Sequence, residues 1–259
     1  MKLLTKKNLW VYVLLAALLF GGAIGGQDSE QSSTIPNTAV SPKETNSAEE
    51  SEVEQSPNPE VSPSPSAKPI RTKAIRALEK IAIKGRAPKT GYTREQFADD
   101  WDYSFGCDTR NKILRRDLVE YRYRSDSSCI IESGILQDPY TDKTIKFVRG
   151  VTTSLAVQID HVVALSDAWQ KGAQKLTAFE RYQFYNDPLN LLAVDGPANS
   201  QKSDSDAASW LPSNKSFRCK YVARQIAVKL KYGLWVTEAE HQSMRRVLEA
   251  CPKQAIPSS

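Results

Sequence analysis

The stretch IDHVVALSDAW at residues 159–169 contains the two residues on which the prediction of fold and function rests. Its first five residues are also the end of the run SLAVQIDHVV at residues 154–163. The β-branched and apolar residues of this run predict a strand that leads into Asp160 and His161. Neighbours on a strand point to opposite faces, so both side chains reach one cleft only if the strand ends or bends there. The following LSDAWQKGA is typical of a helix that ends near Gly172.

The stretch NDPLNLLAVDGPANSQKSD at residues 186–204 adds further polar groups. Its Asn-Asp-Pro sequence predicts a turn, and the apolar residues after it predict a second short strand. Pro197 then favours the start of a helix that carries Asn199 and Lys202 on nearly the same face. Two strands and a helix are therefore predicted to enclose the polar side chains.

These residue types suit phosphodiester hydrolysis, which needs a base to activate water and a hard cation to polarise the phosphoryl oxygen. His161 offers a base near neutral pH, whereas His241 has no comparable neighbours. Asp160 and Asn199 offer the oxygen ligands that magnesium or manganese prefers, with water in the remaining positions. Asn190 could orient the histidine or brace the loop between the strands.

Together the two stretches resemble the HNH (ββα-metal) nuclease superfamily, in particular the C-terminal domain of GmrSD-type restriction endonucleases. The likeness extends through GCDTRNKILRRDL and SGILQDPYTD before the site and through WLP and CKYVARQIAVK after it, so it covers most of residues 90–251. It implies that His161 is the general base, that Asp160 and Asn199 are metal ligands, and that Asn190 is the middle asparagine. The last position of the family pattern is often histidine, and the amide found here favours magnesium or manganese over zinc or nickel.

Basic residues near the motif are candidates for contacts with substrate phosphates. Lys202, Arg181 and Arg110 are the three predicted contacts, and the alternative for each is a solvated or salt-bridged surface residue. Three lysines and no acid give residues 1–26 a charge of +3, and eight acids against two lysines give residues 27–69 a charge of −6, so the chain's +5 leaves +8 for the remainder. This sign favours a polyanionic partner such as nucleic acid. Phosphate contacts carry no sequence information and no companion specificity domain is evident, so we expect cleavage of DNA, or RNA, without sequence preference.

The N-terminal third has the composition of an export signal followed by a tether. Residues 1–26 combine three lysines, an apolar run and small residues, which predicts a cleaved signal peptide or an uncleaved membrane anchor. Residues 27–69 are rich in Ser, Pro and Glu, which predicts a disordered tether. We therefore expect a secreted or surface-tethered protein that meets the membrane only through its N-terminal segment.

Four cysteines lie beyond the predicted tether and include no C-x-x-C pair. An even number in an exported chain favours two disulfides over free thiols or a zinc site. Pairing by neighbourhood favours Cys107 with Cys129 and Cys219 with Cys251, although the sequence leaves three connectivities open.

The predicted fold class of residues 70–259 is α+β, with a ββα-metal motif embedded in a mainly helical, disulfide-stabilised domain. Helical spacing predicts helices over residues 70–84, from Thr93, over NKILRRDLVEYRYR at residues 111–124, over CKYVARQIAVKLKYGL up to Gly233, and from Thr237 with Glu240 in a capping box. Strands are expected on both sides of the turn DPYTD.

Two other functions share the bulk features of this chain. A surface module could bind nucleic acid or a wall polymer without cutting it, and a hydrolase of the same kind could act on another phosphodiester polymer such as a wall teichoic acid. An activity that depends on a divalent metal would indicate a nuclease and not a surface binding module. No obligate protein partner is evident from the sequence.

Overall fold

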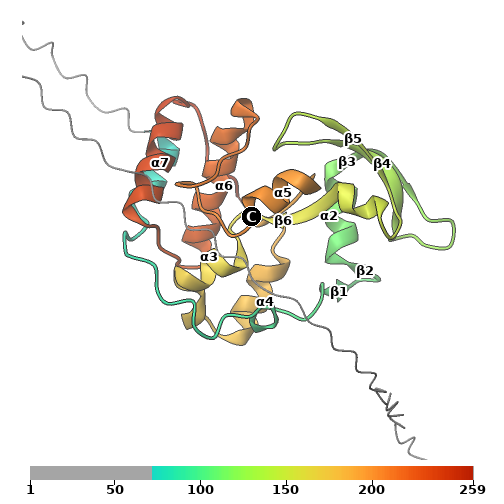
Figure 1. The fold of residues 1–259 in the computed structure, drawn as a ribbon, viewed down its shortest axis with the longest axis horizontal. Coiled ribbons are helices and arrows are strands. Elements are labelled where there is room, and N and C mark those ends of the chain that lie inside the picture. The colour runs from blue at the N-terminus through green and yellow to red at the C-terminus, as the bar shows by residue number, and fades with distance from the viewer. Residues whose placement is uncertain (1–71, 259) are drawn as a thin grey trace, which may run out of the picture. The chain divides into compact units, whose positions relative to one another are not determined.

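The computed structural model describes residues 72–258, shown in colour in Figure 1, so the predicted signal and tether lie outside the described residues. Helices take 41% of the described residues and strands 18%, which makes this part of the chain a mixed α and β structure. The prediction of a mainly helical domain was therefore too strong. Within the described part, no helix is both long and apolar enough to cross a membrane.

A two-stranded antiparallel sheet forms the centre of the fold. Strand β6 (Val157–His161) pairs antiparallel with β7 (Leu191–Asp195), and Asp160 lies opposite Leu192. Helix α5 (Gly196–Lys202) follows directly, and both strands and this helix form where the sequence predicts them.

The start of α5 depends on a small residue and a capping side chain. The carboxylate of Asp195 accepts a hydrogen bond from the backbone N–H of Ala198, and Pro197 occupies the first turn. A Cβ on Gly196 would overlap the carbonyl oxygen of Leu155, so the close approach of α5 to the preceding segment requires glycine there.

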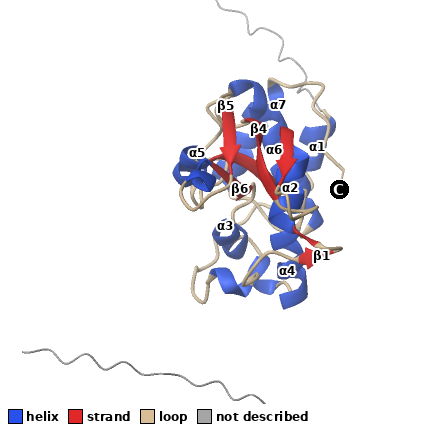
Figure 2. Ribbon diagram, turned by 90° about the vertical axis from the view of Figure 1, so that its right-hand side faces the viewer, coloured by secondary structure: helices blue, strands red, loops and turns tan. Residues whose placement is uncertain are grey.

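The two faces of this two-stranded sheet pack into different hydrophobic clusters, as strand alternation requires. Val157, Ile159, Leu191 and Ala193 belong to one cluster, whereas Leu192 and Val194 belong to another. In Figure 1 strand β6 and helix α5 lie between a three-stranded sheet and the helices α6 (Arg218–Lys231) and α7 (Glu238–Glu249). Figure 2 views the same arrangement from the sheet side, with α3 and α4 below most of the strands. The catalytic candidates are thus held from both sides.

On the sheet side, helix α2 (Thr109–Asp117) packs with an antiparallel sheet of order β3-β4-β5. Its strands are β3 (Leu118–Tyr123), β4 (Ile131–Gln137) and β5 (Thr144–Val148), of which the last two flank the predicted DPYTD turn. The helix predicted to continue to residue 124 was wrong beyond Asp117. The segment LVEYRY is rich in β-branched and aromatic residues, and pairing with β4 outweighs its weak helical pattern.

On the other side, helices α1 (Lys73–Leu78), α6 (Arg218–Lys231) and α7 (Glu238–Glu249) pack together. They form at the predicted places, although α1 is shorter than residues 70–84. The hydroxyl of Thr237 accepts from the N–H of Glu240 as a cap, but the Glu240 carboxylate does not return to the cap because lysine side chains bind it.

A third cluster joins helices α3 (Leu165–Gln170) and α4 (Ala178–Asn186) around Phe97, Trp169 and Phe184. Helix α4, with its capping box, was not predicted from the sequence. The helix expected from Thr93 was wrong, since only the short 3-10 helix η1 forms and Thr93 makes no capping bond. The remaining elements are β1 (Tyr103–Ser104), β2 (Cys107–Asp108), and the 3-10 helices η1 (Arg94–Gln96), η2 (Thr153–Ala156), η3 (Ala173–Lys175) and η4 (Lys215–Phe217).

Two disulfides join the cysteines in the pairing that the sequence favoured. Cys107 is bonded to Cys129, and Cys219 is bonded to Cys251. The first ties strand β2 to the segment before β4, and the second ties the start of α6 to the second residue after the end of α7. Closing these loops restricts the unfolded chain and so stabilises the fold.

A buried network of charges connects α3, α6 and α7. The ammonium of Lys171 lies 2.6 Å from a carboxylate oxygen of each of Asp167, Asp206 and Glu240. Lys229 Nζ lies 2.9 Å from Glu240 and 3.4 Å from Asp167, and both lysines are fully buried. Arg86 adds ion pairs to Asp167 and Asp206. Three cations therefore balance three carboxylates.

Candidate active site

The end of strand β6 opens into a pocket of about 510 Å³. Asp160 and His161 both line it because the strand stops at His161, as one shared cleft requires. Asn199 joins them from α5. The full lining comprises Lys89, Tyr92, Arg94, Ile159, Asp160, His161, Ala164, Leu165, Ser166, Asn199, Ser203 and Asp204.

Asp160 is held by two buried partners. Its Oδ1 accepts a hydrogen bond from Lys202 Nζ at 2.9 Å, and its Oδ2 accepts one from the Tyr140 hydroxyl at 2.5 Å. Asp160 is 5% exposed, and both partners are fully buried. Each carboxylate oxygen has two lone pairs, so both oxygens can still accept a further contact from the pocket side.

Lys202 differs from its predicted role as a phosphate contact. Its ammonium bonds to Asp160 and, at 2.9 Å, to the backbone carbonyl of His161. It does not line the pocket. In the structure it fixes the carboxylate and the end of the strand, rather than facing the solvent.

The imidazole of His161 has a defined orientation. Its Nε2 lies 2.9 Å from the backbone carbonyl oxygen of Tyr185, and a carbonyl can only accept, so Nε2 carries the proton of the neutral ring. The Trp101 ring stacks on the imidazole, with 5.8 Å between the ring centres and 9° between the ring planes. The Tyr185 ring also packs against the imidazole, with 4.9 Å between the ring centres. The Nδ1 atom is therefore the proton acceptor of the ring.

Burial keeps His161 uncharged. It lowers the pKa of the imidazole, and although the hydrogen bond to Tyr185 raises it, the positive charges of Arg94 and Lys202 lower it further, to about 3. The ring is therefore neutral, with a lone pair available on Nδ1, throughout the physiological pH range.

Asn190 lies behind the pocket as a brace. Its Oδ1 accepts from the N–H of Val163 at 2.8 Å, and its Nδ2 donates to the carbonyl of the same residue at 3.3 Å. Its own carbonyl accepts from the N–H of Val162. It is fully buried and does not line the pocket, so of the two roles considered from the sequence the structure shows the brace.

Asn199 directs its side-chain amide toward strand β6. Its Nδ2 donates to Gln158 Oε1 at 2.8 Å, which orients the amide. Its Oδ1 makes no hydrogen bond with any residue between 72 and 258, which leaves this oxygen as an acceptor at the pocket that Asp160 also lines.

Arg181 and Arg110 do not reach this pocket. Arg181 donates to the carbonyls of Gln96 and Leu176. Arg110 is largely buried and donates to the carbonyl of Val157 at 3.3 Å. Both guanidiniums therefore serve the packing of backbone segments, and the predicted contacts with substrate have no counterpart in the pocket lining.

The sequence did not predict that Lys89, Tyr92 and Arg94 line this pocket, because they come from a distant part of the chain. Lys89 forms an ion pair with Asp204 at 3.2 Å, and Ser166 donates to the same carboxylate at 3.0 Å. Arg94 donates to the Tyr185 hydroxyl at 2.8 Å and lies over its ring. Lys89 and Arg94 lie some 70 residues before His161 in a Gly- and Pro-containing segment, and no sequence signal connected the two regions.

The donor atoms in the pocket suit a hard cation. One carboxylate and one neutral amide, with water in the remaining positions, form a set of oxygen ligands that magnesium accepts and zinc disfavours. Among residues 72–258 there is no group of three or more His, Cys, Asp or Glu side chains that could form a complete cage. The side-chain oxygens of Asp160 and Asn199 are of the ligand type that a hard cation prefers.

Known proteins are similar to the part of the chain that contains Asp160, His161 and Asn199. A family model described as GmrSD restriction endonucleases, C-terminal domain, matches residues 108–247, more than half of the chain. A protein of Arthroderma benhamiae described as an uncharacterized secreted protein is 36% identical over 185 residues, which cover 71% of this chain and 87% of that protein. Lys89, Tyr92 and Arg94 precede the region that the family model matches.

Proposed function

Because this chain belongs to the family of GmrSD restriction endonuclease C-terminal domains, we propose that it is an exported endonuclease that uses a divalent cation to hydrolyse DNA, or RNA, without sequence preference. The observation that supports this most is the orientation of His161, whose Nε2 is tied to a carbonyl while its neutral ring lines one pocket with Asp160 and Asn199. That arrangement presents a base and a pair of oxygen ligands together.

In this proposal His161 acts as the general base. Its Nδ1 accepts a proton from the attacking water, while the hydrogen bond from Nε2 to Tyr185 stabilises the imidazolium that forms. Trp101 and Tyr185 hold the ring in one orientation, so the base needs no reorganisation before proton transfer.

Asp160 and Asn199 would hold the cation, which when bound supplies charge to polarise the phosphoryl oxygen and to stabilise the leaving oxygen. Lys202 and Tyr140 keep the Asp160 carboxylate in place from the interior. Asn190 joins the ends of the two strands and so fixes the position of the base relative to these ligands.

Export is proposed on three observations. Two disulfides stabilise the described part of the chain, the relative from Arthroderma benhamiae is described as secreted, and residues 1–26 have the form of a signal. Cell fractionation tests it: the chain is expected in the medium or at the cell surface, and recovery with cytosolic markers would contradict the proposal.

The test of function is cleavage by the full chain of supercoiled plasmid DNA and of RNA, with magnesium, with manganese, and with a chelator. Cleavage with either metal and none with the chelator is expected. Binding of both polymers without cleavage under any metal would instead indicate a surface binding module. Cleavage of wall teichoic acid alone would move the substrate to another phosphodiester polymer.

Lys89 is proposed as a phosphate contact, because it lines the pocket and its ammonium makes an exposed ion pair with Asp204, in which 54% and 47% of the two side chains are exposed, and lies 5.4 Å from the centre of the Tyr92 ring. Substituting Lys89→Met is expected to weaken DNA binding similarly for all sequences and to lower the salt dependence, the slope of log K against log salt, by about one. Binding titrations at several salt concentrations measure both. Lys253→Met, an exposed lysine near the C-terminus, is the matched control, and equal slopes for the two variants would exclude the contact.

A further inference from the structure

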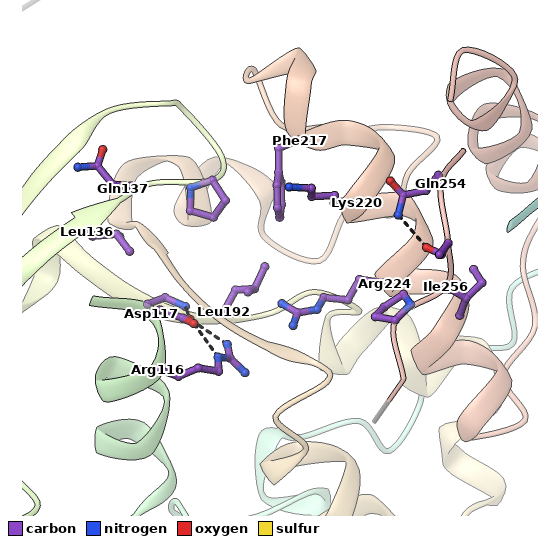
Figure 3. Close-up of a pocket in the computed structure, with 14 residues that line it drawn as sticks. Arg116, Asp117, Leu136, Gln137, Leu192, Phe217, Lys220, Arg224, Gln254 and Ile256 are labelled. Atoms are coloured by element: carbon purple, nitrogen blue, oxygen red, sulfur yellow. Dashed lines mark hydrogen bonds and ion pairs between the residues drawn. The ribbon is translucent and has the colours of Figure 1, made fainter. Parts of the chain in front are cut away.

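A second cavity of about 640 Å³ lies against the outer edge of strand β7, and none of its lining residues lines the catalytic pocket (Figure 3). Leu192 and Ala193 contribute to it from β7, and the C-terminal segment closes one side through Ile256. That segment lies beyond the region matched by the family model. The volume is in the range that accommodates a small organic ligand.

The cavity contains a guanidinium without a partner. Arg224 is half-buried and makes no hydrogen bond or ion pair with any residue of the described part of the chain. Figure 3 shows its guanidinium directed into the cavity toward Leu192. Burial and the nearby charge of Arg116 lower the pKa of Arg224, and they outweigh the carboxylates of Asp117 and Asp187, which raise it. An anion placed in the cavity would relieve the cost of burying this charge.

The guanidinium of Arg116 already has partners within the protein, so Arg224 is the better candidate to bind an anion. It pairs with Asp117 at 2.6 Å and donates to the carbonyls of Pro188 and Leu191. Lys220 lies one helical turn before Arg224 on α6, lines the same cavity, and is likewise without a hydrogen bond or ion pair among residues 72–258. Two cations on one helix face are thus free to bind one anionic group.

The rest of the wall is apolar and includes an aromatic ring. Leu136, Leu192 and Ile256 line the cavity, and the ring of Phe217 is only partly buried. In Figure 3 the Phe217 ring stands beside the cavity with Lys220 next to it. A matching ligand therefore combines an anionic group with a flat body that can pack against an aromatic ring.

We propose that this cavity binds a nucleoside monophosphate, with the phosphate at Arg224 and Lys220 and the base against Phe217. The choice of a nucleotide among aromatic anions rests on the proposed function, since phosphodiester cleavage produces chains that end in such a group. No residue lines both sites, so a nucleotide bound here leaves the proposed catalytic pocket open.

Calorimetric titration of adenosine 5′-monophosphate into the full chain, with chelator present, tests the proposal. Saturable binding is expected, and Arg224→Met should weaken it about tenfold or more, because a charge-assisted contact to phosphate is lost. Phe217→Leu should weaken the nucleotide several-fold but leave the binding of inorganic phosphate unchanged. Arg246→Met, an exposed arginine on α7 outside the cavity, should have no effect.

Equal affinity in the wild type and Arg224→Met would overturn the proposal, as would the absence of saturable binding. Binding of dodecanoate at this site with no binding of the nucleotide would overturn the ligand class. Because chelator suppresses cleavage, the outcome is independent of catalysis. Arg224-dependent binding in a chain that cuts no nucleic acid would refute the proposed function and leave the site standing.

Discussion

Substituting Asp160→Asn is expected to reduce cleavage about a hundredfold and to lower the free energy of unfolding by about 3–5 kcal/mol. The amide retains the shape and can still accept from Tyr140, but it no longer neutralises the buried ammonium of Lys202, which lies 2.9 Å away. The stability loss therefore comes from Lys202, whereas the loss of cleavage comes from the weakened cation site.

The double variant Asp160→Asn/Lys202→Met separates the two effects. Removing both charges together should restore most of the lost stability, because no uncompensated charge remains in the interior. Cleavage should stay low, since the carboxylate ligand is still missing. Chemical denaturation and plasmid cleavage measure the two quantities. Recovery of cleavage together with stability would show that Asp160 acts only as a structural ion-pair partner.

Substituting Lys171→Met is expected to cause the largest loss of stability, about 3–5 kcal/mol, at a site outside the pocket. Its ammonium contacts three carboxylates, those of Asp167, Asp206 and Glu240, each at 2.6 Å and all nearly inaccessible to solvent. Without it, only Lys229 and Arg86 remain to balance three negative charges. Denaturant unfolding monitored by tryptophan fluorescence measures the change.

Two comparisons make this result specific to the network. Lys171→Met/Glu240→Gln removes one charge of each sign and should recover part of the stability, whereas Lys253→Met at the exposed C-terminal segment should change it by less than about 0.5 kcal/mol. A Lys171→Met variant as stable as the wild type would show that the ion pairs contribute nothing net.

The same network predicts sensitivity to acid. Burial alone would raise the pKa of Asp206, but the charge of Lys171 and hydrogen bonds from Lys171, Ala208 and Arg86 lower it to about 2. The folded-state pKa lies below the ordinary value of 3.8, so this carboxylate contributes stability above pH 4 that is lost as the pH falls toward 2.

The sequence predicted strands β6 and β7 and helix α5 because local signals and tertiary packing agree there. The apolar run before Asp160, the Asn-Asp-Pro turn and Pro197 each have a direct structural counterpart in β6, the turn and α5. Predictions failed where a local pattern competed with pairing. The segment after Asp117 contains a helical pattern, yet β4 supplies a strand partner, and only the fold reveals that partner.

The residues that surround the site could be predicted less well from the sequence. Lys202 was expected at the surface because a lysine on a short polar helix usually is, and its burial follows from the meeting of α5 with Asp160. Tyr140, from the turn after β4, and Lys89 and Arg94, from the segment before β1, reach the pocket region through tertiary packing. No sequence spacing connects these segments to the motif.

The most direct test of the account compares the two histidines of the chain in one assay: the rate of metal-dependent DNA cleavage by His161→Ala and by His241→Ala, each checked for folding by thermal unfolding. We predict that the cleavage rate of folded His161→Ala falls by a factor of about 10²–10⁴ and that His241→Ala keeps the wild-type rate, since His241 lies outside the pocket. A folded His161→Ala variant that cuts within about threefold of the wild-type rate would contradict the assignment of His161 as the general base.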